Sequence, residues 1–125
     1  DILLDLSSDK SIYVQIAENI ENDILLGNLR EEDQAPSTNQ FAKIYQINPA
    51  TAGKGLNLLV EENILYKKRG LGMFVAEGAR KKILKKRQSL FFKEILPHIM
   101  TEAKRLEITA DDIVEFIKKE KGGKS

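Results

Sequence analysis

The chain has 125 residues and a mass of 14.1 kDa, enough for one compact domain with a few additional helices but not for two domains with separate cores. Hydrophobic residues make up 42% and charged residues 31%, there is no Cys, and no apolar run approaches membrane-spanning length. This composition predicts a soluble globular protein and excludes disulfides, thiol catalysis and thiolate metal sites. Residues 1–6 are too acidic to begin a signal peptide, so we expect a cytoplasmic protein with no membrane association.

The net charge of +1 conceals an uneven distribution of charge along the chain. Residues 1–63 contain four basic and eleven acidic residues, whereas residues 64–93 contain ten basic residues and Glu77 as the only acid. A basic segment in an otherwise acidic chain predicts binding to a polyanion. The alternative is a solvated helix face with ordinary lysines, and charge alone does not decide between the two.

A first helix is predicted to begin after Ser11, whose hydroxyl can cap it. Isoleucines recur every four residues along it, at positions 12, 16, 20 and 24, and Gly27 is a natural stop. The polar segment 28–36 that follows is predicted to be a loop with at most a short strand.

The next segment carries the signals of two helices joined by a short turn. Ser37 and Gln40 match a capping box, which predicts that a second helix begins at Ser37. Asn48 followed by Pro49 predicts another helix start, because Asn accepts from exposed N–H groups while Pro occupies a turn where its missing donor is harmless. This third helix is expected to end near Glu62. The two helices together predict a helix-turn-helix over about residues 38–57.

A different periodicity then indicates a β-hairpin. Apolar and basic residues at 64–68 and 73–76 flank Arg69-Gly70-Leu71-Gly72, which predicts a glycine turn with a cationic tip. A helix, a helix-turn-helix and a basic hairpin in this order form a winged helix. The predicted fold is therefore mainly α with a small β-hairpin (α+β), with a winged helix-turn-helix domain at residues 10–76 and its wing at about 64–76.

The remaining residues, 77–125, are predicted to form a helical dimerisation region. A broad apolar stripe at helical spacing contains Leu84, Phe91, Phe92, Ile95, Leu96, Ile99 and Met100. A region of this size has too little of its own chain to cover these side chains, which predicts a homodimer. Pro97 is expected to kink or split this helix, and Thr109 with Asp112 is typical of the start of a last helix.

Four sequence segments match a known pattern. They are IYVQIAENI (12–20), PSTNQFAK (36–43), INPATAGKGLNLLVEENIL (47–65) and KRGLGMFV (68–75). In this order and spacing they resemble the DNA-binding domain of the GntR family of transcriptional regulators. The Asn-Pro helix start and the short helical tail look like the YtrA-like branch, which lacks large effector domains. The resemblance implies repression of nearby transporter-type genes. The homodimer predicted from the apolar stripe implies in turn a roughly palindromic operator.

The sequence departs from the family pattern at several positions. Asn39, Pro49 and Gly53 lie where members of other branches often carry Arg for DNA contact, and Met73 stands where Thr is usual. These differences leave the docking mode intact but leave the base-reading residues undetermined.

In a helix-turn-helix the second helix enters the major groove, and its first residues reach base edges. The residues at these positions are Asn48, Ala50, Thr51 and Lys54. Asn can read adenine, Thr can meet a thymine methyl, and Lys can reach guanine or phosphate. The alternative is that Asn48 is only a cap and Lys54 only a solvated charge. Gly53 and Gly55, each costing about 1 kcal/mol relative to Ala, indicate close approach to DNA or to the first helix, or a tolerated weakness.

Two further segments are expected to contact DNA. Ser37, Thr38 and Asn39 begin a helix whose N–H groups suit a phosphate, although Ser37 is also fully explained as a cap. The wing residues expected to reach the DNA backbone or the minor groove are Lys68, Arg69, Gly70 and Gly72. The alternative for the wing is an ordinary tight hairpin.

Neither an enzyme nor a cofactor is expected. No nucleophile–base pair, phosphate-binding glycine loop or carboxylate pair stands out. His98 is the only histidine, so a metal site is not expected, and its apolar helix predicts a packed or hydrogen-bonded side chain.

Two functions from different classes fit these residues. The first is a sequence-specific regulator that binds double-stranded operator DNA as a homodimer. We expect any small effector of such a regulator to bind between the winged domain and the tail helices, near Pro97, His98 and Met100; the alternative is that no metabolite binds. The second function is a winged-helix protein-interaction or assembly module, in which the basic segment serves solubility.

Overall fold

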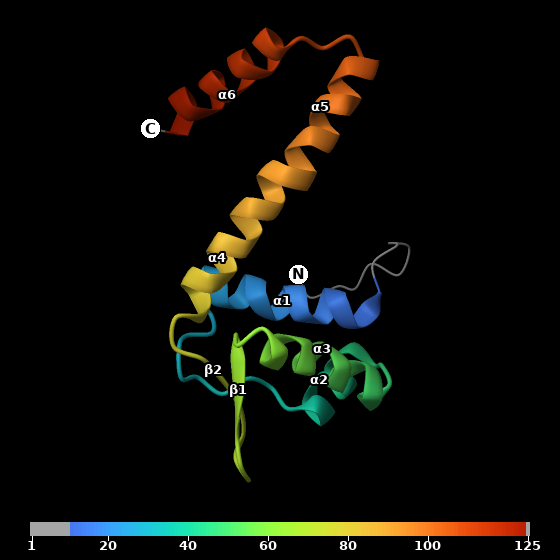
Figure 1. The fold of residues 1–125 in the computed structure, drawn as a ribbon, viewed down its shortest axis with the longest axis vertical. Coiled ribbons are helices and arrows are strands. Elements are labelled where there is room, and N and C mark those ends of the chain that lie inside the picture. The colour runs from blue at the N-terminus through green and yellow to red at the C-terminus, as the bar shows by residue number, and fades with distance from the viewer. Residues whose placement is uncertain (1–10, 125) are drawn as a thin grey trace. The chain divides into compact units, whose positions relative to one another are not determined.

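The computed structural model describes residues 11–124, and by its internal contacts the chain divides into two compact units after Lys85 (Figure 1). The acidic stretch 1–6, from which the absence of a signal peptide was argued, lies outside the described residues, as do Lys10 and Ser125 at the ends of the expected domains. The described residues form helices and one small sheet, so the predicted fold class is confirmed. The first unit extends past the wing, because Ala79 and Ile83 are fully buried in its core.

Helix α1 (Ile12–Leu26) buries the predicted isoleucine stripe and ends at Gly27, which has a left-handed backbone with φ 84°. Ile16, Ile20 and Ile24 are at most 2% exposed. Ser11 occupies the N-cap position, but its hydroxyl makes no capping bond, so that prediction is wrong. The backbone carbonyl of Ser11 accepts from the N–H of Gln15 instead. Burial of the stripe, rather than a side-chain cap, accounts for this helix.

The predicted helix-turn-helix comprises α2 (Thr38–Tyr45) and α3 (Pro49–Glu61). The capping box is formed: Ser37 Oγ accepts from the Gln40 N–H at 3.1 Å, and Gln40 Oε1 accepts from the Ser37 N–H at 2.8 Å. Asn48 Oδ1 accepts from the Ala50 N–H at 2.7 Å, with Pro49 in the first turn. These local bonds set where each helix begins.

The wing consists of β1 (Leu65–Lys68) and β2 (Gly72–Val75), paired antiparallel with Leu65 opposite Val75. A third segment, residues 32–35, lies along the other edge of β2. The N–H of Ala35 donates to the carbonyl of Met73 and the N–H of Glu32 to that of Val75, both at 2.8 Å. The predicted loop therefore supplies a short extended segment that anchors the wing, and Figure 1 shows the hairpin projecting beyond α2 and α3.

The core of the first unit joins α1, α2, α3, the wing and the first turns of α4. Its largest fully buried side chains are Ile16, Ile20, Leu56, Leu59, Ile64, Leu65, Val75 and Ile83. Gly55 lies where α3 crosses α1: a Cβ there would stand 2.7 Å from the carbonyl oxygen of Tyr13 and 3.1 Å from Ile16 Cβ. Close packing against the first helix therefore explains Gly55.

The second unit contains the rest of α4 (Ala79–Leu90), a π-helical turn (Phe91–Ile95), α5 (Leu96–Arg105) and α6 (Ala110–Lys124). Pro97 does not split the helix. The turn before it widens, with the N–H of Leu96 donating to the carbonyl of Phe91, and Pro97 lies in the first turn of α5. Thr109 and Asp112 exchange hydrogen bonds of 2.9 and 3.1 Å at the start of α6, where a helix start was predicted.

Candidate nucleic-acid interface

The outer face of α3 follows from the burial of its inner face. Ala52, Leu56 and Leu59 are fully buried, and at helical spacing this turns Ala50, Lys54 and Asn57 outward, where all three are exposed. Thr51 is half-buried at the edge of this face. Asn57 was not nominated from the sequence, although its spacing of three residues from Lys54 was a usable signal. The polar outer face is therefore wider than predicted.

Lys54 is more than a solvated charge. Its Nζ lies 4.8 Å from the centre of the Tyr13 ring on α1, within the range of a cation–π contact. The side chain is nevertheless exposed. Lys54 is thus partly ordered by Tyr13 while its ammonium group stays accessible, at an exposed position where such contacts contribute about 0.5–1 kcal/mol.

The start of α2 lies beside the outer face of α3. A Cβ at Gly53 would be 3.6 Å from Thr38 Cγ2, which is ordinary van der Waals contact, so packing does not require glycine at position 53. Ser37 and Asn39 are exposed and Thr38 is half-buried. The capping box occupies Ser37, while the first N–H groups of a helix have no partner within the helix. A helix start, the kind of position that can accept an anion, therefore adjoins the predicted recognition helix.

The wing tip is a tight turn with an exposed apolar side chain. The N–H of Leu71 donates to the carbonyl of Lys68 at 2.9 Å, and Gly70 and Gly72 have φ of 77° and 116°. These conformations favour glycine. Arg69 is exposed, and the Leu71 side chain is 64% exposed.

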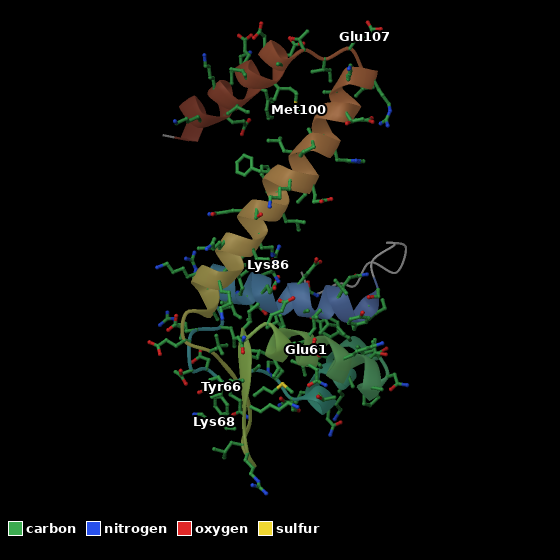
Figure 2. All side chains as sticks on the ribbon, viewed as in Figure 1. Glu61, Tyr66, Lys68, Lys86, Met100 and Glu107 are labelled. Atoms are coloured by element: carbon green, nitrogen blue, oxygen red, sulfur yellow. The ribbon has the colours of Figure 1, made fainter. Side chains whose placement is uncertain are left out.

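Lys68 lies along the hairpin rather than at its tip. Its Nζ is 4.3 Å from the centre of the Phe74 ring and 5.8 Å from that of Tyr66, and Figure 2 shows Tyr66 and Lys68 on β1. The hydroxyl of Tyr66 donates to Glu32 Oε1, and this hydrogen bond to a carboxylate raises the pKa of Tyr66 above its ordinary value. The bond adds a side-chain link between β1 and the segment 32–35.

Comparison with known proteins identifies the family. The model of bacterial regulatory proteins of the gntR family matches residues 12–75. The chain belongs to the GntR family. It is 29% identical to the HTH-type transcriptional repressor YtrA of Bacillus subtilis (strain 168), over 98% of this chain and 97% of YtrA.

Two solved structures extend this GntR relationship. A crystal structure of a GntR-family transcriptional regulator from Bacteroides thetaiotaomicron superposes with a TM-score of 0.76 at 33% identity, over 91% of this chain and all of that one. The DNA-binding domain of AraR, crystallised in complex with operator ORE1, superposes with a TM-score of 0.53 at 27% identity, over 59% of this chain and 90% of that one. This GntR chain is a DNA-binding transcription regulator and not an enzyme.

The apolar stripe of this GntR chain is largely uncovered in a single copy. Phe91, Phe92, Ile95, Ile99 and Met100 are between 40 and 66% exposed, and Leu96 is half-buried. Leu84 differs from them, because it lies half-buried in the first unit beside the fully buried Ile83. Further exposed apolar residues, not included in the predicted dimerisation set, are Leu90, Leu106, Ile108, Val114, Phe116 and Ile117.

His98, which was predicted to be packed or hydrogen-bonded, is exposed, so its own chain does not pack it. The reason is that the apolar residues around it, including Ile99 and Met100, are themselves uncovered. Among residues 11–124, no group of three His, Cys, Asp or Glu side chains is arranged to hold a metal ion. None of the helices in the same range is long and apolar enough to cross a membrane.

Proposed function

We propose that this GntR chain is a sequence-specific repressor that binds a palindromic operator as a homodimer. The observation that carries the proposal is the combination, within the first unit, of an exposed polar face on α3, an adjoining helix start on α2 and an exposed cationic wing tip. Each suits a different part of DNA: base edges, phosphates and the minor groove. The AraR–operator complex supports this arrangement, since its DNA-binding domain shares the fold.

In this proposal the residues divide by role. Those facing base edges are Asn48, Ala50, Thr51 and Lys54; those facing phosphates are Ser37, Thr38 and Asn39; those of the wing are Lys68, Arg69, Gly70 and Gly72. Asn57 joins the first group because it shares the exposed face of α3. We assign Lys68 to the DNA backbone rather than to a base, because its ammonium group lies over the Phe74 ring along the hairpin and not at its tip.

A second copy of the chain is the occupant we propose for the apolar stripe. Two copies of the stripe can cover each other through a two-fold axis, because an isologous interface uses the same patch twice. Residues 84–100, which carry the stripe, contain four basic residues and one acidic residue, so the pairing rests on the burial of apolar side chains and not on charge complementarity. A two-fold dimer presents two recognition helices and so requires a palindromic site.

Repression is the direction of regulation that we propose, and its support is the similarity to the repressor YtrA along nearly the whole of both chains. The site of action is then the bacterial cytoplasm, where operator DNA lies. A small effector would release the operator only to the extent that it binds one dimer arrangement better than the other.

The proposal is tested by gel retardation at physiological salt, with DNA duplexes that the protein has selected from a random pool. Thr51→Ala and Lys54→Ala are each expected to weaken specific binding by about 1–3 kcal/mol, through loss of a base contact, while the fold is retained. Lys118→Ala is the matched control for Lys54→Ala, because it removes the same charge from an exposed position on α6. If both α3 variants bind like the wild type, α3 is not the reader. If no duplex is specifically retarded, the assembly-module alternative is supported instead.

A further inference from the structure

One long-range contact joins the segment before α2 to the wing tip. Gln34 Nε2 donates to the backbone carbonyl of Leu71 at 2.7 Å, across 37 residues of sequence. The backbone of Gln34 pairs with Phe74 on β2, which brings its side chain alongside the turn. The tip is therefore held from a second segment, in addition to its own hairpin pairing.

The two glycines of the tip have different relations to this contact. A Cβ at Gly72 would lie 2.8 Å from Gln34 Nε2, whereas a Cβ at Gly70 would meet nothing within 4 Å. Glycine at 72 therefore permits the amide to reach the Leu71 carbonyl, besides allowing φ of 116°. Gly70 is needed for the conformation of the turn alone.

The contact engages the backbone of Leu71 and leaves its side chain facing outward at the tip. The Leu71 N–H is engaged with Lys68 and its carbonyl with Gln34, so both backbone polar groups are bonded within the protein. The side chain is 64% exposed and follows the exposed Arg69. An apolar side chain next to Arg suits the minor groove, where proteins insert apolar wedges and Arg.

The same segment also leads into the start of α2. Only Ala35 and Pro36 separate Gln34 from Ser37, and the N–H of Ala35 is bonded to the carbonyl of Met73 on β2 at 2.8 Å. We propose that Gln34 is a positioning residue that fixes the wing tip relative to the start of α2, so that Leu71 enters the minor groove at the edge of each half-site. This inference rests on the proposed DNA binding and adds a residue that does not itself read a base.

Gln34→Met tests the inference, because Met has similar length and no charge but cannot donate to the carbonyl. We expect lower NMR order parameters for the Gly70 and Gly72 amides, and about three- to tenfold weaker operator binding, the range for one lost hydrogen bond. The decisive readout is discrimination at the base pairs protected by the wing. There an inosine·cytosine (I·C) base pair presents the same minor-groove edge as an A·T pair, whereas a G·C pair adds the N2 amino group of guanine to that edge.

The wild type is expected to bind equally well when an A·T pair beneath the wing is replaced by I·C, and to bind more weakly when it is replaced by G·C. In Gln34→Met, the ratio of the affinities for the A·T and G·C duplexes is expected to fall at least threefold. Discrimination at the base pairs that α3 faces, at the centre of the half-site, is expected to stay unchanged. Gln34→Lys, which restores a donor, is expected to recover the tip order parameters and the discrimination. Leu71→Ala is expected to lose the discrimination with the tip still ordered.

Three results would overturn the inference. One is Gln34→Met with unchanged tip order and unchanged discrimination. Another is an equal loss at wing and α3 positions, which would indicate a general effect on the fold. The third is a wild type that binds no duplex specifically, which contradicts the proposed function itself and is seen before any variant is compared.

Discussion

The two units of the chain differ in where their apolar side chains lie. In the first unit the isoleucine stripe of α1, the inner face of α3 and the strands of the wing enclose one another. In the second unit Ala103 is the only buried hydrophobic residue of the described part, while Phe92 and Phe116 are each at least 64% exposed. The first unit thus completes its own core, whereas the second lacks one in a single copy. In the proposed assembly, the winged unit with its own core contacts DNA, and the tail pairs with a second copy that covers its apolar side chains.

The largest effect is expected from charging the tail. Ile95→Glu with Ile99→Glu should split the dimer, because it places four carboxylates in the paired stripe, and operator affinity should fall on the order of 100-fold or more as the second half-site is lost. Analytical ultracentrifugation measures the dissociation of the dimer, and gel retardation measures the loss of operator affinity. The control is Lys93→Gln with Lys104→Gln, which lowers the net charge of each copy by the same two units, but at exposed polar positions of the same segment. This variant should remain dimeric. A folded, unchanged dimer of the Glu variant would place the interface elsewhere.

A smaller effect is expected in the core of the first unit. Leu56→Ala removes a fully buried side chain, which should lower the free energy of unfolding by about 2–5 kcal/mol. Urea denaturation followed by circular dichroism measures it. Leu71→Ala at the exposed wing tip is the matched control and should change stability by less than about 0.5 kcal/mol. Equal losses from the two changes would mean that the first unit does not enclose its core as described.

The smallest effects distinguish the two glycines of α3. Gly55→Ala should destabilise the first unit by about 1–3 kcal/mol, because its Cβ would meet the Tyr13 carbonyl oxygen at 2.7 Å. Gly53→Ala, whose Cβ would make ordinary contact with Thr38, should be neutral or stabilising by up to about 1 kcal/mol through helix propensity. Thermal unfolding of the two variants should therefore shift in opposite directions, or in the Gly55 variant alone. The reverse order would contradict the packing of α1 against α3.

Features set by neighbouring residues could be predicted from the sequence. The capping box at Ser37 and the Asn48-Pro49 start are formed as expected, because each is made by residues at most three positions apart. The glycine turn of the wing follows from equally local chemistry. The order of these elements was sufficient to predict the winged helix.

Contacts between distant segments could not be predicted in this way. The Gln34–Leu71 hydrogen bond and the pairing of residues 32–35 with β2 join partners more than thirty residues apart, and no local pattern marks them. The π-turn before Pro97 is a different case: proline predicts a disturbance, but whether the helix splits or widens depends on how the preceding turn relaxes. His98 was misjudged because an apolar helix was taken to be a covered one.

Selection of bound duplexes from a random DNA pool tests most directly the claim that paired tails present two winged units to one operator. The account predicts enrichment of two inverted half-sites whose centres lie about 10–10.5 base pairs, or a multiple of that spacing, apart. The Ile95→Glu, Ile99→Glu variant should no longer enrich the paired arrangement. Enrichment of a single unpaired half-site by the wild type, or of no sequence at all, would contradict the account.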